Sequence, residues 1–136
     1  MVINRRQAIG RKGEAIACQY LLKKGYTVLA KNVRTPYGEI DLIVSQNDVA
    51  NLPEQQILIF VEVKARTSYT FGFPEDSIAA RKKNSMLASI QYYLQEHSEI
   101  DSDWQIDVIA INLAEKPDET VITHFPNAIS SETEGI

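Results

Sequence analysis

Two short stretches place charged side chains inside segments that otherwise have the composition of buried strands. GEIDLI carries Glu39 and Asp41, and FVEVKAR, further along the chain, carries Glu62 and Lys64. Because side chains alternate between the two faces of a strand, Glu39 shares a face with Asp41, and Glu62 shares a face with Lys64. If the two strands pair, Asp41 and Glu62 can lie side by side.

Two neighbouring buried carboxylates repel each other, so such a pair is unfavourable unless a proton or a cation joins them. Carboxylate oxygens are ligands that hard divalent ions such as Mg²⁺ or Mn²⁺ accept. We therefore predict a divalent metal site at Asp41 and Glu62, with Lys64 beside a metal-bound water or a bound phosphate. The alternative is a structural ion pair of the carboxylates with Lys64 or an arginine.

A third carboxylate belongs to RRQAIGRKGEAIACQYLLKK, residues 5–24, which we predict to be a helix. Ala17, Cys18 and Leu21 follow Glu14 at positions i+3, i+4 and i+7, so Glu14 points with the apolar stripe toward the sheet. A glutamate on a buried face needs a partner, and a metal cluster would supply one. Glu14 is therefore a further candidate ligand.

The rest of the chain predicts the elements that position these residues. Residues 57–65 form the most apolar segment, which we expect to be a central strand covered on both faces. A second helix is expected at 75–97, with Glu75 and Asp76 in its first turn, where the helix dipole favours acids. The other strands are expected at 26–33, 38–45, 104–113 and 120–125.

The resulting order α-β-β-β-α-β-β predicts an α/β domain with a mixed central sheet flanked by helices. A chain of 136 residues has the size of one domain with a single core. We expect this domain to span residues 1–129 and a flexible acidic tail to span residues 130–136.

Charge is distributed unevenly along the chain. Residues 1–34 hold eight basic residues and one acid, whereas residues 95–136 hold ten acids and one basic residue. This asymmetry indicates a basic end that faces a polyanion, although one-sided charge also occurs on merely exposed faces. The candidates for binding nucleic-acid phosphates are Arg5, Arg6, Arg11, Lys12 and Arg34, with Arg66 next to the predicted metal site and Lys82 early in the second helix.

Other features limit the compartment and the kind of site. No apolar run reaches the ~18 residues that a membrane span requires, and the basic, polar N-terminal residues are not expected to be a secretory signal. The single cysteine, Cys18, excludes an internal disulfide and favours a cytoplasmic location. We expect His124 to be packed or hydrogen-bonded rather than catalytic, and Asp107 to pair with an arginine.

An acid on one strand followed by acid-x-lysine on the next resembles the metal site of the PD-(D/E)xK nuclease superfamily. This superfamily includes restriction endonucleases, archaeal Holliday junction resolvases and RecB-like nucleases. More closely, the chain resembles the YraN-like family of small uncharacterised bacterial proteins, which are endonuclease-like. The resemblance runs from Gly13 to Ala128 and includes both GEIDLI and FVEVKAR. The other matching residues are Gly13-Glu14, Ala17, Tyr20-Leu21, Gly25-Tyr26, Phe71-Gly72, Pro74, Lys82, Asp107-Val108, His124 and Asn127-Ala128.

This resemblance implies a restriction-endonuclease-like fold, in which Asp41, Glu62 and Lys64 form a nuclease-like triad with Glu14 beside it. It implies a metal-dependent endonuclease, or a nuclease-like nucleic-acid-binding protein, that hydrolyses phosphodiester bonds in DNA repair or recombination. Asp41, Glu62, the Val63 carbonyl and Glu14 would hold Mg²⁺ or Mn²⁺, and Lys64 would orient the attacking water. The expected partners are nucleic acid, DNA first, and a second copy of the chain. The alternative is a catalytically inactive nucleic-acid-binding or adaptor protein with the same fold.

Overall fold

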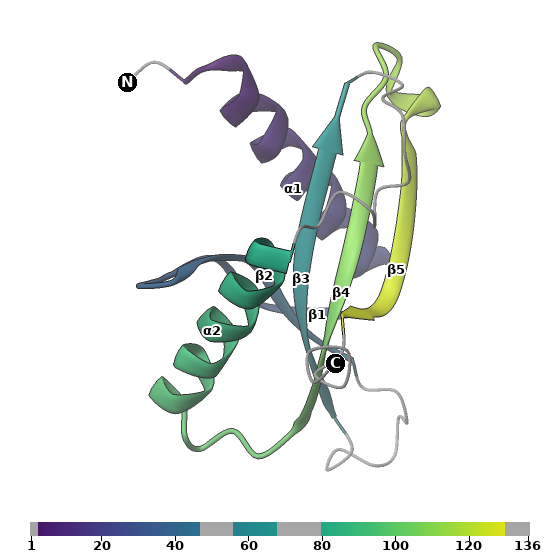
Figure 1. Cartoon of the computed structure of the whole chain (residues 1–136). Coiled ribbons are helices and arrows are strands. Elements are labelled where there is room, and N and C mark those ends of the chain that lie inside the picture. Colours follow the sequence, from purple (N-terminus) through teal and green to yellow (C-terminus); the bar gives the residue numbers. More distant parts are fainter. Residues whose placement is uncertain (1–2, 47–55, 68–79, 130–136) are drawn as a thin grey trace.

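The computed structural model describes residues 3–46, 56–67 and 80–129. Within these ranges the elements follow one another in the predicted order α-β-β-β-α-β-β, which is confirmed (Figure 1). The elements are α1 (Arg5–Lys23), β1 (Thr27–Thr35), β2 (Gly38–Gln46), β3 (Ile57–Arg66), α2 (Ala80–Glu96), β4 (Asp103–Asn112) and β5 (Val121–Ile129), with a short 3-10 helix at Pro117–Glu119. Glu75, Asp76 and the expected tail 130–136 lie outside the described residues.

The five strands form one mixed sheet in the order β1-β2-β3-β4-β5. All neighbouring strands are antiparallel except β3 and β4, which are parallel and lie on either side of α2 in the sequence. A parallel pair requires such a crossover connection. The most apolar strand, β3, is the middle strand of this order, so its predicted central position is confirmed.

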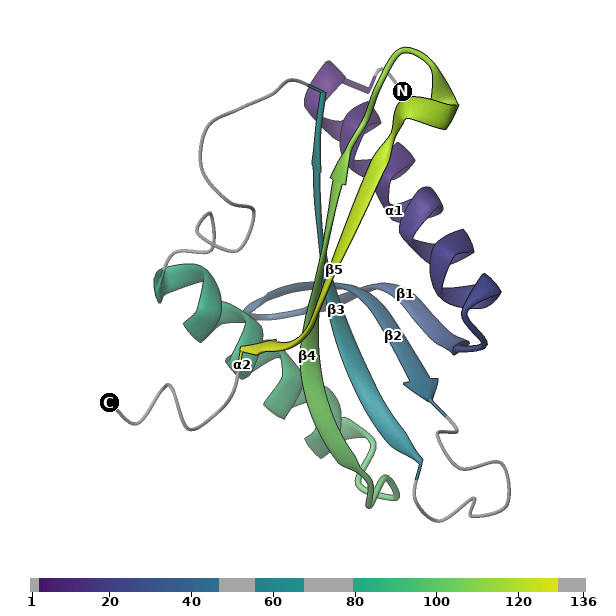
Figure 2. The ribbon, with the colours of Figure 1, turned by 90° about the vertical axis from the view of Figure 1, so that its right-hand side faces the viewer.

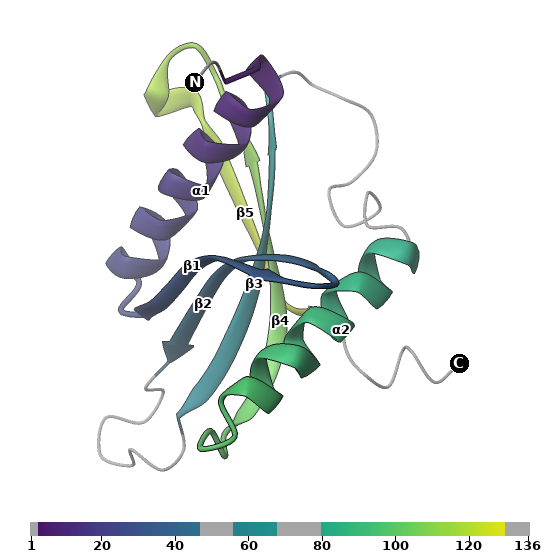
Figure 3. The same cartoon turned by 90° about the vertical axis from the view of Figure 1, so that its left-hand side faces the viewer.

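One helix covers each face of the sheet, as Figures 2 and 3 show from opposite sides. Alternate residues of β3 point to the two helices: Ile59 packs in the core beneath α1, and Phe60 packs in the core beneath α2. Burial on both faces explains why β3 reads as a continuous apolar run rather than an alternating one. None of the described helices is long and apolar enough to cross a membrane.

Helix α1 lies very close to β3 around Gly13. A capping box formed by Asn4 and Gln7 begins the helix, and Gly25, with φ of 96°, follows its end. A Cβ atom added at Gly13 would overlap the Cβ atom of Ala65 on β3. The absence of a side chain at Gly13 thus brings the next residue, Glu14, close to the sheet.

The β1–β2 hairpin leaves the sheet at its far end. The β2–β3 ladder begins at Gln46 and Ile57 and stops at Leu42 and Val61. Beyond this point the hairpin bends toward α2, as Figure 3 shows, and Thr35 Oγ1 donates a 2.9 Å hydrogen bond to Ser89 Oγ on that helix. Residues 39–41 of β2 therefore lie where the two strands part.

Asp107 lies in a buried network with His124, and its pairing with an arginine stays a prediction. The Asp107 carboxylate accepts hydrogen bonds from Gln105 Nε2 at 2.8 Å, from the Asn127 backbone N–H at 2.9 Å and from His124 Nε2 at 2.7 Å. His124 Nδ1 lies 3.1 Å from the Tyr20 hydroxyl on α1. The network joins α1 to β4 and β5, in keeping with the hydrogen-bonded histidine expected at position 124.

Candidate metal centre

Three carboxylates from two elements converge where the hairpin leaves the sheet. One oxygen from each of Glu14, Glu39 and Asp41 lies within 4.8 Å of the others. Glu39 and Asp41 share a face of β2, as alternation requires, and Glu14 approaches from α1. The sequence anticipated that Glu14 points toward the sheet, but it did not indicate that Glu39 would join the cluster.

Asn32 on β1 lies between two of these carboxylates. With its amide oxygen and nitrogen assigned to satisfy both partners, the amide donates hydrogen bonds to Glu14 Oε1 at 2.8 Å and to Glu39 Oε1 at 3.3 Å. Asn32 has φ of 51°, a left-handed conformation that asparagine tolerates better than most residues. Asn32 was not expected at the site from the sequence, in which the available signal was an asparagine inside a predicted strand.

Asp41 also contacts the neighbouring strand. Its Oδ2 atom accepts a 2.9 Å hydrogen bond from the Val63 backbone N–H. The last pair of the ladder joins Leu42 to Val61, so Asp41 and Glu62 occupy the next register position, immediately beyond it. The predicted proximity of Asp41 and Glu62 therefore follows from the observed register.

The carboxylates raise one another's affinity for protons. Burial, followed by the charges of Asp41 and Glu39, raises the pKa of Glu14 to about 7, against the hydrogen bond from Asn32 and the charge of Arg11. Since a shifted pKa measures how unfavourable the charged form is, Glu14 is destabilised as a free carboxylate in this position.

Glu62 and Asp41 behave in the same way on the other side of the cluster. Burial and the Asp41 charge raise the pKa of Glu62 to about 7, and the charges of Lys82 and Lys64 oppose this. Burial raises the pKa of Asp41, whereas the Val63 N–H and the Lys82 charge lower it. Glu62 is only 5% exposed, so solvent does little to relieve its charge.

The cation closest to Glu62 comes from α2 and not from β3. Lys82 Nζ lies 3.6 Å from Glu62 Oε2. Lys64 forms no ion pair within 4.0 Å with a carboxylate in the described ranges, although its charge lowers the Glu62 pKa from a greater distance. Within the described ranges, the structural ion pair considered from the sequence therefore exists with Lys82 and not with Lys64.

The basic candidates divide between several surfaces. Arg11 and Arg34 line a cavity of ≈ 420 Å³ together with Glu14 and Glu39, and Arg34 Nε lies 3.6 Å from Glu39 Oε2. Lys12 lines a different hollow beside β5. Arg5 and Arg6 are exposed in the first turn of α1, and Arg66 ends β3. Of the N-terminal candidates, Arg11 and Arg34 are therefore brought to the carboxylates, and Lys12 is not.

The donor set fits a hard divalent cation. Glu14, Glu39, Asp41 and Glu62 offer only oxygen ligands, the type that Mg²⁺ and Mn²⁺ accept. The raised pKa values of Glu14 and Glu62 show that their negative charges are poorly compensated. A bound cation would supply that compensation.

Comparison with known proteins agrees with the extent of the sequence resemblance. A family model described as "Uncharacterised protein family UPF0102" matches residues 13–111. A UPF0102 protein of Syntrophotalea carbinolica is 37% identical over 90% of this chain and 92% of its own length. A UPF0102 protein of Pelotomaculum thermopropionicum is 38% identical over 90% of this chain and 96% of its own length. The matched region contains every carboxylate of the cluster.

Proposed function

The chain belongs to the uncharacterised protein family UPF0102, and we propose that it is a divalent-metal-dependent nuclease that hydrolyses phosphodiester bonds in nucleic acid. The observation that carries the proposal is the convergence of Glu14 on α1 with Glu39 and Asp41 on β2, with Glu62 of β3 at the register position beside Asp41. The resemblance of GEIDLI and FVEVKAR to the PD-(D/E)xK motif supports it further. No such convergence is needed for packing, because burial of the carboxylates is unfavourable in the absence of a cation.

In this proposal Asp41 and Glu62, with the Val63 carbonyl, hold the metal, and Glu14 and Glu39 ligate it directly or through water. Mg²⁺ or Mn²⁺ bound there would polarise the scissile phosphate and lower the pKa of a bound water. One oxygen of Asp41 accepts a hydrogen bond from the Val63 N–H, and this bond fixes the orientation of the carboxylate. The position of this carboxylate is thus set before the metal binds.

Lys64 is the proposed stabiliser of negative charge on the phosphate. It follows Glu62 by two residues on β3, so both side chains lie on the same face of the strand. In contrast to Lys82, it has no described carboxylate within 4.0 Å and is available to a substrate. Positioned charges of this kind stabilise a transition state more than a ground state.

Arg11 and Arg34 are the proposed contacts to flanking phosphates. Both line the cavity that Glu14 and Glu39 also line. Guanidinium groups beside a carboxylate cluster would offset its negative charge, which otherwise repels a nucleic acid.

A second candidate is favoured by the 3.6 Å contact between Lys82 and Glu62. If this ion pair persists in solution, it compensates Glu62 without a metal. The chain would then be a nucleic-acid-binding or adaptor protein in which the charged strands are structural. The two candidates differ in whether a divalent cation is required.

A cleavage panel tests the proposal directly. Linear duplex, single-stranded, flapped and four-way DNA, and single-stranded and duplex RNA, are incubated with the protein in Mg²⁺, Mn²⁺ or EDTA. We expect cleavage of at least one substrate in the presence of metal, and none in EDTA or with Asp41→Asn. Metal-independent binding of the same substrates without cleavage under any condition would favour the second candidate.

A further inference from the structure

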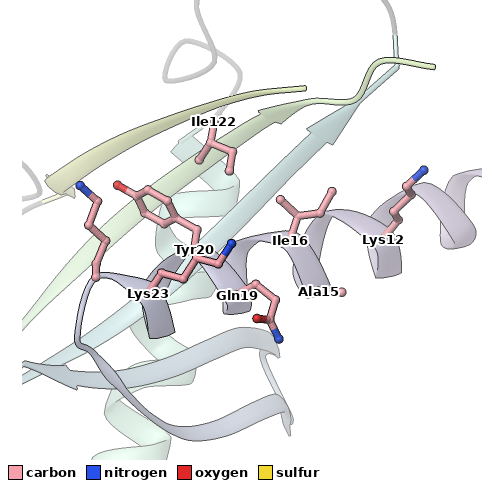
Figure 4. Close-up of a pocket in the computed structure, with 8 residues that line it drawn as sticks. Lys12, Ala15, Ile16, Gln19, Tyr20, Lys23 and Ile122 are labelled. Atoms are coloured by element: carbon pink, nitrogen blue, oxygen red, sulfur yellow. The ribbon is translucent and has the colours of Figure 1, made fainter. Parts of the chain in front are cut away.

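A second hollow lies on the flank of α1 that faces β5, away from Glu14. It has a volume of ≈ 660 Å³ and runs along three turns of the helix, from Lys12 to Lys24, with Ile122 of β5 on its other side (Figure 4). We call it the β5 groove. It is separate from the cavity that Arg11 and Glu14 share.

The β5 groove has an apolar floor and a basic rim. Ile16, the Tyr20 ring and Ile122 form the half-buried floor, and the rim residues are Lys12, Lys23 and Lys24, with the exposed Ala15 and Gln19 beside them. No acidic residue is among the described residues that line it. The Tyr20 hydroxyl lies 3.1 Å from His124 Nδ1, so the polar group of the floor already has a partner.

Strand β5 adds backbone hydrogen-bonding groups to this surface. It is the last strand of the sheet, and no other strand in the described ranges pairs with its outer edge. Ile122 and His124 point toward α1, whereas Phe125 packs on the α2 side. A strand added beside β5 would therefore place every second side chain over the groove.

Pro126 limits where such a strand could pair. Proline has no backbone N–H and is tolerated in sheets on edge strands. We therefore expect an added ladder along residues 121–125 of β5, the part of the strand that precedes the proline and contains Ile122.

We propose that the β5 groove binds an extended acidic segment of a partner protein, which adds to the outer edge of β5. Charge complementarity with Lys12, Lys23 and Lys24 requires acidic residues on that segment. The apolar floor requires apolar side chains on the same face of the segment as these acidic residues. A nucleic-acid strand fits less well. The floor between the three lysines is apolar and adds no hydrogen-bond donors for phosphates to those of the lysines. The proposal does not depend on the nuclease activity.

The first probe is a fluorescein-labelled eight-residue peptide, Val-Thr-Asp-Thr-Val-Thr-Asp-Thr, in which valine and aspartate share the face that lies over the groove. We expect saturable binding by fluorescence anisotropy and amide shift changes at residues 121–125 in ¹⁵N spectra. The double variant Lys23→Glu, Lys24→Glu should raise the Kd about tenfold or more. A tenfold rise corresponds to a loss of about 1.4 kcal/mol of binding free energy. Lys83→Glu, on α2, is the matched control and should leave the Kd unchanged.

Three control probes separate the contributions of charge, apolar contact and backbone pairing. Replacing aspartate by lysine, replacing valine by glycine, or methylating the amide nitrogens on one edge of the peptide should each abolish binding. All variants are checked by thermal unfolding, so that misfolding is distinguished from loss of the groove.

Three results would overturn the proposal. One is equal binding of the aspartate and lysine peptides, or no binding of either. A second is binding of oligo(dT), but not of the valine–aspartate peptide, with the same dependence on Lys23 and Lys24. The third is self-association in sedimentation experiments that these substitutions abolish, which would assign the groove to a second copy of the chain.

Discussion

The Asp41 carboxylate replaces a missing backbone partner of Val63. Its Oδ2 atom accepts a hydrogen bond from the Val63 N–H at 2.9 Å, just beyond the last β2–β3 pair. The same side chain is thus a structural link between the two strands and a candidate metal ligand. Because of this double role, Asp41→Asn and Asp41→Ala should have different effects. The asparagine side-chain oxygen can still accept the hydrogen bond from Val63, whereas alanine cannot.

The first prediction concerns metal binding. Mn²⁺ or Mg²⁺ should raise the melting temperature of the wild type, because a ligand at one hundred times its Kd stabilises the folded state by ~2.7 kcal/mol. Asp41→Asn should abolish this rise and leave the metal-free protein as stable as the wild type or more so. Asp41→Ala should destabilise it by ~1–3 kcal/mol, since it leaves the Val63 N–H without a partner. Calorimetry with and without EDTA measures both effects, and an equal metal response in Asp41→Asn would exclude the site.

The second prediction concerns pH. Glu14 and Glu62 have pKa values raised from 4.5 to about 7 in the folded protein. Because the folded state binds these protons more tightly than the unfolded chain, their contribution to stability is complete below the unfolded pKa and is lost as the pH rises through about 7. Urea unfolding in EDTA should therefore show a free energy of unfolding that falls between about pH 5 and about pH 7.5.

Two further measurements check the origin of this pH dependence. The double variant Glu14→Gln, Glu62→Gln should show a flatter profile, and an unchanged profile would assign the effect to other groups. In saturating Mg²⁺ the fall should shrink, because the cation favours the charged carboxylates and releases their protons.

The third prediction separates the two lysines near Glu62. Lys64→Met keeps the aliphatic stem, so the fold and substrate binding should persist while cleavage falls by ~10²-fold or more. Lys82→Met should instead lower stability, because Lys82 is the residue 3.6 Å from Glu62. Its effect should be larger at pH 8 than at pH 6, since a protonated Glu62 needs no cation. If Lys64→Met unfolds the protein, or cleaves at the wild-type rate, its proposed role is wrong.

The fourth prediction concerns nucleic-acid binding. Arg11 and Arg34 line the cavity with Glu14 and Glu39, whereas Lys12 lines the β5 groove. Arg11→Glu and Arg34→Glu, made separately, should each weaken duplex DNA binding and reduce the slope of log K against log salt by about 0.9 per lost phosphate contact. Lys12→Glu is the charge-matched control and should have a smaller effect. Equal effects of all three reversals would indicate a diffuse field rather than a site.

The fifth prediction concerns the approach of α1 to the sheet. Gly13→Ala places a Cβ atom against the Ala65 side chain on β3, so it should destabilise the fold by ~1–3 kcal/mol. Gly10→Ala lies in the same helix with nothing within 4 Å, and it should stabilise the protein by up to ~1 kcal/mol through helix propensity. Chemical unfolding of both variants measures this contrast, and equal shifts would show that α1 is not packed tightly at Gly13.

The sequence by itself determined the elements and the direction of several side chains. The apolar run at 57–65 predicted the central strand, because only a strand covered on both faces needs apolar residues at every position. Strand alternation placed Glu39 with Asp41, and helical spacing turned Glu14 toward the sheet. These are local properties with fixed periods, and all of them appear in the structure.

Tertiary structure decided which elements face each side chain. Glu62 could have paired with Lys64 on its own strand. The crossover between the parallel strands β3 and β4 instead places α2 across this face, so Lys82 lies next to Glu62. Glu39 joins Glu14 because the hairpin bends away from β3 and Asn32 adopts a left-handed conformation. Periodicity defines the face on which a residue lies, whereas the residues opposite it depend on register, twist and crossover, which bring together positions far apart in the chain.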